Sequence, residues 1–200
     1  MMLSFNEEMK IIDEKTIQLD RELSELDQIV LKFVKILQKH VRYVLVSGYV
    51  AILFGRSRGT EDVDFIIEKL SKDKFFKLYH ELLESGFWSI SVDDPQELFA
   101  LLSEEKLAVR FAEKGKVFPN MEVKFVRDAL DTWALKERIK IIIKNGDLFT
   151  SQIEMQIAYK KFILKSPKDL EDARHLQKLF NVNEDKINKY KLILEQYGRI

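Results

Sequence analysis

The segment between residues 43 and 67 constrains the fold more than any other part of this chain. The apolar, β-branched run Tyr43–Val46 predicts a short buried strand, which Ser47-Gly48 ends. Residues 49–54 then have the spacing of a short helix, and residues 63–67 predict a second strand. A strand, a tight turn, a short helix and another strand in such close succession indicate an α/β unit built on a sheet.

The remaining periodicity predicts more strands and then a run of helices. Ser24 followed by Asp27 is typical of a capping box and predicts a first helix. Strands are predicted at 106–112, 121–126, 138–143 and 148–150, and helices at 72–83, 152–164, 168–180 and 184–196. The turn Asn145-Gly146-Asp147 indicates a hairpin. The predicted fold class is α/β (α+β), a mixed β-sheet core with an N-terminal helix in residues 1–150 and a packed C-terminal helical segment in residues 151–200.

Composition narrows the class of protein. The 33 basic and 33 acidic residues balance, which argues against a protein that coats nucleic acid through bulk charge. The chain has no cysteine, so it has neither disulfides nor thiolate metal sites. The charged N-terminal stretch does not resemble a signal peptide, and no apolar run has membrane-spanning length, so we expect a cytoplasmic protein without membrane partners. The abundance of Lys and Glu is typical of a thermophile.

Asp62 and Asp64 are the first candidate site residues. Side chains at positions i and i+2 of a strand point to the same face, so these two carboxylates lie side by side. They repel each other unless a cation lies between them. Mg²⁺ prefers oxygen ligands and shares them with phosphate, so the pair predicts a metal site. Taken alone, Asp-x-Asp is also common at a solvated strand edge.

The residues around this pair predict a clamp for a nucleoside triphosphate. Small residues at Ser47-Gly48 let backbone N–H groups approach a phosphate. Arg56, Arg58 and Thr60 precede the acids and are expected to neutralise phosphate oxygens or orient the loop. Ser-Gly alone is only a turn, and it is the order and spacing of these parts that favours nucleotide binding.

The same segment resembles the signature of the DNA polymerase β-like nucleotidyltransferase superfamily. Gly55, Arg58, Thr60, Asp62 and Asp64 are similar to the pattern of its small uncharacterised and toxin-like members, including AbiEii-type proteins. The turn has the order Ser-Gly where the family has Gly followed by Gly or Ser. The resemblance implies an NTP substrate, Mg²⁺ or Mn²⁺ as cofactor, and transfer of a nucleotidyl group to a hydroxyl.

The C-terminal segment adds a looser likeness to the AbiEii-type group. Lys160 or Lys161 matches a helical lysine of these proteins, which implies a reach toward nucleotide phosphate. Asp169 and Asp172 match a Lys-Asp-x-x-Asp element and share one helix face. Their alternative interpretation is a capped surface helix held by salt bridges.

Active members of the superfamily use a third acid on a later strand, and here two residues compete for that place. Judged by its spacing to the following Arg127-Asp128, the position of the family's acid is occupied here by Lys124. Glu122 lies two residues earlier on the same face of the strand. Either Glu122 assists catalysis at the acceptor hydroxyl, or Lys124 replaces the second metal with a fixed positive charge, which favours nucleotide binding and disables transfer.

Three hypotheses follow from the sequence. The protein transfers a nucleotidyl group to RNA, protein or a small molecule, with Asp62, Asp64 and Glu122 as catalytic residues. Alternatively, it is a catalytically impaired nucleotide-binding module of a toxin–antitoxin-like system. The third hypothesis is a plain RNA-binding domain. It is the least favoured, because this sequence lacks the aromatic stacking motif that such domains use. The sequence leaves the acceptor, the base and the oligomeric state open.

Overall fold

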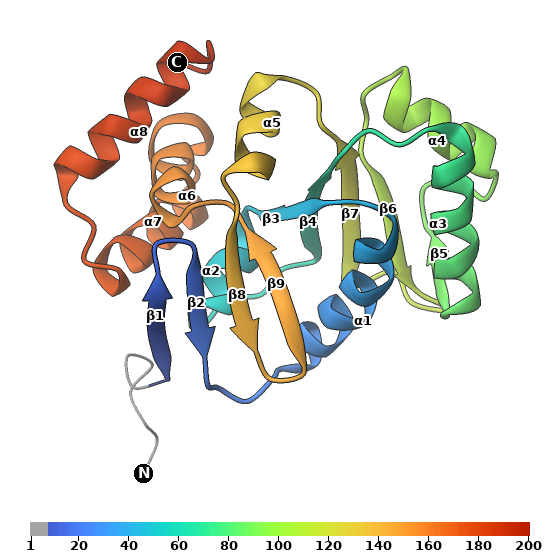
Figure 1. Ribbon diagram of the computed structural model, residues 1–200, viewed down its shortest axis with the longest axis horizontal. Coiled ribbons are helices and arrows are strands. Elements are labelled where there is room, and N and C mark those ends of the chain that lie inside the picture. Colours follow the sequence, from blue (N-terminus) through green and yellow to red (C-terminus); the bar gives the residue numbers. More distant parts are fainter. Residues whose placement is uncertain (1–7) are drawn as a thin grey trace.

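The computed structural model describes residues 8–200, which form one mixed sheet of nine strands with helices against both faces (Figure 1). The predicted fold class is thereby confirmed. The strands are β1 (Met9–Asp13), β2 (Thr16–Leu19), β3 (Tyr43–Val46), β4 (Asp62–Ile67), β5 (Phe87–Ser89), β6 (Val109–Glu113), β7 (Asn120–Phe125), β8 (Ile139–Ile143) and β9 (Gly146–Thr150). The helices are α1 (Glu25–His40), α2 (Gly48–Leu53), α3 (Lys72–Glu84), α4 (Pro95–Ser103), α5 (Ala129–Lys136), α6 (Ile153–Tyr159), the π-helical turn η1 (Lys160–Leu164), α7 (Pro167–Leu179) and α8 (Glu184–Gln196).

The strands follow the order β1-β2-β8-β9-β3-β4-β7-β6-β5 across the sheet. At its centre, β3 runs antiparallel to β4, whereas β7 runs parallel to β4. The chain reverses after β3 through α2, and β4 and β7 therefore begin at the same edge of the sheet, beside the turn that follows β3.

Side chains of the central strands alternate between two faces. Leu45 and Phe65 belong to the main core, which α1 and α3 cover. Ile66 points to the opposite face, where Val44 of β3 and two side chains of α5 pack against it. Asp62 and Asp64 have the phase of Ile66, so both carboxylates lie on the α5 face of the sheet.

The neighbouring strand β7 repeats this alternation. Met121, Val123 and Phe125 are buried in the main core, which leaves Glu122 and Lys124 on the α5 face. Because β4 and β7 are parallel and in register, these two side chains lie beside those of β4. The period-two pattern of apolar residues thus collects the charged side chains of both strands on one face.

The first helix begins as the sequence predicts. The Ser24 hydroxyl accepts a hydrogen bond from the Asp27 backbone N–H, and the Asp27 carboxylate accepts one from the Ser24 N–H, which is a capping box. The same carboxylate accepts hydrogen bonds from Arg21 at 2.8 and 3.0 Å and from the Tyr49 hydroxyl at 2.7 Å. Asp27 therefore joins the start of α1 to α2.

Several elements differ from the sequence-based prediction. The strands β1, β2 and β5 and the helices α4 and α5 were not predicted. The two helices begin with Asp94 before Pro95 and with Asp128, both of which cap N–H groups. The hairpin of β8 and β9 is confirmed, but Gly146 already pairs with Ile143 inside the ladder, so the turn lies earlier than predicted.

The C-terminal segment packs as a cluster of helices. α6 contacts α7 and α8, and α7 also contacts α2 of the sheet unit. A single helix was predicted over 152–164, whereas the chain changes from α to π winding at Lys160. In the part of the chain that the structure describes, no helix is both long and apolar enough to cross a membrane.

Candidate functional site

The turn after β3 has an unusual backbone. Ser47 has φ 66° and ψ −137°, a conformation that glycine adopts far more readily than serine. This conformation turns the chain directly from the end of β3 into α2, which starts at Gly48. Ser47 thus occupies, at some strain, a position suited to glycine.

Register places the acidic residues of β4 and β7 next to each other. Asp64 pairs with Glu122 of β7 on one side and with Val46 of β3 on the other. Lys124 pairs with Ile66, and Asp62 pairs with Asn120. The residue beside Asp64 is therefore Glu122, whereas spacing along the sequence favoured Lys124 for the family's third acid.

The environment of Asp64 disfavours its negative charge. Burial is the main cause, followed by the carboxylates of Asp62 and Glu122, and together they raise the pKa of Asp64 to about 6. Lys124 and the Ser47 side chain oppose this shift. The acids of the α5 face thus repel one another, and a cation placed among them would relieve this repulsion.

Glu122 of β7 is held by an arginine of β6, the strand on the other side of β7 from β4. Its carboxylate accepts hydrogen bonds from Arg110 Nε at 2.8 Å and Nη2 at 2.7 Å. The bond to Glu122 raises the pKa of Arg110. Within residues 8–200, no three His, Cys, Asp or Glu side chains converge closely enough to hold a metal ion by themselves. A metal bound here would take two protein carboxylates and complete its coordination with ligand oxygens.

Thr60 fixes the start of the β4 strand. Its hydroxyl donates a hydrogen bond of 2.8 Å to the backbone oxygen of Asp62. The loop that leads to β4 is thereby tied to the first of the two acids. The sequence predicts that Thr60 acts on nucleotide, and in the structure its hydroxyl contacts the backbone of Asp62.

Arg56, Arg58 and Lys160 meet around a buried carboxylate of α7. Asp172, fully buried, accepts hydrogen bonds from Arg56 Nε at 3.0 Å, from an Arg58 nitrogen at 2.6 Å and from Lys160 Nζ at 2.9 Å. Lys160 is 1% exposed and bonds Asp169 as well. We call Arg56, Arg58, Lys160, Asp169, Glu171 and Asp172 the α7 ion network.

Charge within the α7 ion network balances, with three cations facing three carboxylates. It connects the loop after α2 to the C-terminal helices. The Arg58 guanidinium passes so close to Gly48 that a Cβ atom there would lie 3.0 Å from one of its nitrogens. Lys161 stands apart, because its amine binds Glu184 of α8 at 3.1 Å. Apart from Lys161, the predicted charged site residues therefore fall into two groups, one on the α5 face and one around Asp172.

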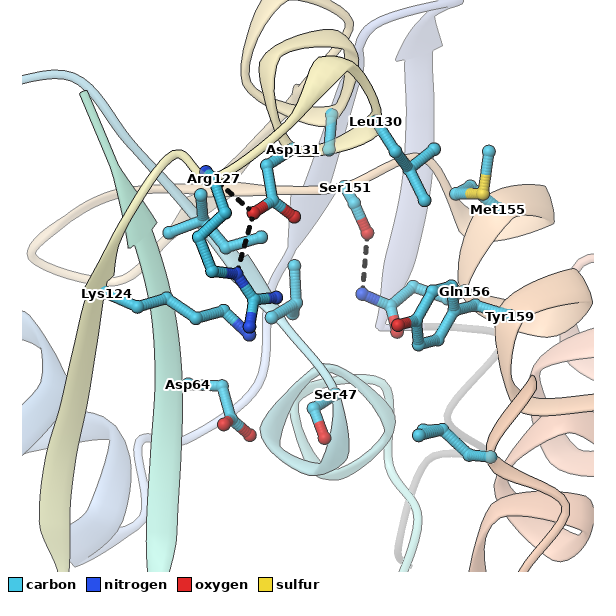
Figure 2. A pocket seen from close by; sticks show the side chains of 14 residues that line it. Ser47, Asp64, Lys124, Arg127, Leu130, Asp131, Ser151, Met155, Gln156 and Tyr159 are labelled. Carbon is cyan, nitrogen blue, oxygen red and sulfur yellow. Dashed lines mark hydrogen bonds and ion pairs between the residues drawn. The ribbon is translucent and has the colours of Figure 1, made fainter. Parts of the chain in front are cut away.

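A pocket of about 220 Å³ opens beside Asp64, and neither Asp62 nor Glu122 lines it. Figure 2 shows Asp64 and Ser47 at one end of it, Lys124 and Arg127 to one side, and Gln156 with Tyr159 opposite. The lining residues come from the sheet, from α5 and from α6 and η1: Val46, Ser47, Asp64, Ile66, Lys124, Arg127, Leu130, Asp131, Ala134, Ser151, Met155, Gln156, Tyr159 and Leu164.

Several of these residues had no signal in the sequence. Arg127 donates from its backbone N–H and from Nε to Asp131, at 3.1 and 3.2 Å, which holds its side chain over the pocket. Gln156 and Tyr159 lie on a helix whose periodicity was visible, but periodicity does not show that a buried polar residue faces a cavity. Their role depends on how α6 packs against the sheet.

Comparison with known proteins adds little to this description. No known family model matches the sequence, and no curated protein is significantly similar to it. Among solved structures, the crystal structure of an antigenic nucleotidyltransferase-like protein from Paracoccidioides brasiliensis has a TM-score of 0.48 and 18% sequence identity, over 87% of this chain and 89% of that chain. Any functional assignment must therefore rest on the residues of the site.

Proposed function

We propose that the protein is a metal-dependent nucleotidyltransferase, which moves a nucleotidyl group from an NTP to a hydroxyl of RNA, protein or a small molecule. The observation that supports it most is the group of charges on the α5 face. Asp62, Asp64 and Glu122 crowd together, and burial with mutual repulsion raises the pKa of Asp64 to about 6. Such a group favours binding of a divalent cation.

The donor set fits magnesium or manganese shared with a triphosphate. Asp62 and Asp64 would hold the ion with carboxylate oxygens, and phosphate and water would supply the remaining ligands, as is usual for Mg²⁺. When bound, the ion supplies electrostatic stabilisation of the transferring phosphoryl group. Lys124 and Arg127 lie at the same pocket and are positioned to neutralise phosphate oxygens.

The chain's own residues perform the remaining tasks in this proposal. Ser47 and Gly48 form the turn beside the phosphates, and Thr60 fixes the strand that carries Asp62. Glu122, next to Asp64, is the group that could accept a proton from the acceptor hydroxyl. Glu122 must release Arg110 or share it in order to act in this way.

The contact between Glu122 and Arg110 favours a second candidate function. A carboxylate oxygen that already accepts two hydrogen bonds from a guanidinium is not free to take the proton of an acceptor hydroxyl. Lys124, one ladder step from Glu122, adds a positive charge that acts on Asp64. The second candidate is a module that binds nucleotide without transferring it.

Incubation with labelled NTPs, Mg²⁺ and total cellular RNA or protein separates the two candidates. Transfer of label to an acceptor that is lost in Asp64→Asn supports the enzyme. NTP binding that depends on Mg²⁺ without transfer supports the binding module. Asp185→Asn, at an exposed position of α8, is the matched control and should behave as the wild type. Binding that persists after chelation of metal and in Asp64→Asn contradicts both.

A further inference from the structure

The two ends of the pocket differ in chemistry. The end formed by the sheet carries Ser47, Asp64 and Lys124, whereas the end formed by α5, α6 and η1 is mostly apolar, with side chains of Leu130, Met155, Tyr159 and Leu164. Pockets that enclose a whole drug-sized ligand measure about 300–1,000 Å³. At about 220 Å³, this pocket has room for one ring-sized part of a larger molecule.

One polar group is set into the apolar end. Gln156 is 4% exposed and lines the pocket, and its amide nitrogen donates a hydrogen bond of 2.6 Å to the Ser151 hydroxyl. This bond fixes the plane of the amide. Among the described residues, the amide oxygen and the second N–H of Gln156 have no hydrogen-bond partner. Gln156 is not among the described residues with a fully enclosed unpartnered side-chain atom, so its free amide groups face the pocket and are available to a ligand or to water.

Tyr159 supplies a flat surface next to that amide. It lies one helical turn after Met155, and Figure 2 shows its ring beside Gln156, opposite Lys124 and Arg127. An aromatic face, apolar walls and an amide that can both donate and accept are the groups that proteins use to hold a nucleobase and read its edge. The apolar end of the pocket thus suits a planar base, and the end with Ser47, Asp64 and Lys124 suits the phosphate oxygens of a molecule that extends out of the pocket.

On the basis of the proposed function, we propose that the apolar end holds the nucleobase of the NTP and that Gln156 is a specificity-determining residue. Its amide pairs with hydrogen-bonding groups on the base edge, while Ser151 positions the amide. Bases that present a mismatched group leave the buried amide unpaired and bind more weakly. The pocket therefore selects among the four NTPs, although the triphosphate end binds what all of them share.

Calorimetry of the full chain with Mg²⁺ tests this, using the four NTPs and inorganic tripolyphosphate as probes. We expect the best NTP to bind about tenfold or more tightly than tripolyphosphate, and the four NTPs to differ by about fivefold or more, the effect of one hydrogen bond. Gln156→Leu should reduce the differences between the bases to less than about twofold and leave tripolyphosphate binding unchanged. Gln177→Leu, at a half-buried glutamine of α7 outside the pocket, is the matched control.

The outcomes separate this inference from the proposed function. Equal binding of NTPs and tripolyphosphate, or base preferences that persist in Gln156→Leu, would overturn the inference and leave the proposed function standing. Absence of binding by every probe would overturn both. If thermal unfolding shows that Gln156→Leu does not fold, Ser151→Ala replaces it, because loss of the positioning hydroxyl should weaken the same preference.

Discussion

The two groups of charged residues are built on opposite principles. In the α7 ion network, three cations meet three carboxylates, and Asp172 is fully buried with a partner on every side. On the α5 face, Asp64 lies between two other acids, and its pKa is raised to about 6. The first group holds the C-terminal helices to the loop after α2. The second is unfavourable in the protein by itself, which is expected of a site that binds a charged ligand.

The largest effect on stability should come from disrupting the α7 ion network. Asp172→Ala leaves Arg56, Arg58 and Lys160 without their shared carboxylate, and loss of one partner of a buried ion pair lowers the free energy of unfolding by about 3–5 kcal/mol. Urea unfolding measures the change. Asp62→Ala, in the other group, should change stability far less. A loss below about 1 kcal/mol in Asp172→Ala would show that the network is not structural.

A smaller effect on stability should come from a change in the acids of the α5 face. The pKa of Asp64 is raised from its ordinary 3.8 to about 6, so the folded protein holds this proton more tightly than the unfolded chain. The contribution of Asp64 to stability is therefore most favourable below pH 4 and falls as pH rises through about 6. Asp64→Asn removes this dependence and should raise the free energy of unfolding at neutral pH by about 2–3 kcal/mol.

Urea unfolding at a series of pH values measures this dependence, with Asp185→Asn as the control for loss of an exposed carboxylate. Addition of Mg²⁺ should reduce the difference between Asp64→Asn and the wild type, because the ion stabilises only the ionised acid. A pH profile that is the same in Asp64→Asn and the wild type would contradict the raised pKa.

The smallest effect on stability should come from a change in the turn after β3. Ser47→Gly relieves a backbone conformation with φ 66°, and we expect it to stabilise the protein by about 1 kcal/mol after the entropy of glycine is subtracted. Thermal unfolding detects this as a higher midpoint. Ser47→Ala keeps the strained backbone and removes only the hydroxyl, so it should not raise the midpoint. Equal midpoints for both variants would show that the turn is not strained.

Local patterns in the sequence were enough to predict part of this site. Side chains alternate between the two faces along each strand, and this alternation can be read from the sequence of one strand. It places Asp62 on the same face as Asp64, and Glu122 on the same face as Lys124. Which residue lies beside Asp64 depends on the register of two strands separated by more than fifty residues. Spacing along the sequence has no information on that register, and here it favoured Lys124.

Other features lay beyond sequence reasoning because they arise only when distant elements meet. Asp172 was open to two interpretations, and its burial among Arg56, Arg58 and Lys160 depends on how α7 packs against α2. The place of Gln156 in the pocket likewise depends on how α6 packs. The helices α4 and α5 had cap signals at Asp94 and Asp128, but short amphipathic patterns between strands made them hard to distinguish from loops.

The wall of the pocket contributed by α6 has a thermodynamic consequence. Asp64 belongs to the sheet and Ser47 to the turn after β3, while Gln156 and Tyr159 belong to the C-terminal helices, so one bound molecule would touch both units. The free energy released by that molecule adds to the contacts that keep the C-terminal helices against the sheet unit, such as those between α7 and α2. The stability with which the last fifty residues pack on the sheet unit then increases with ligand concentration. Slower exchange of the α6 amide hydrogens at higher ligand concentration would measure this increase directly.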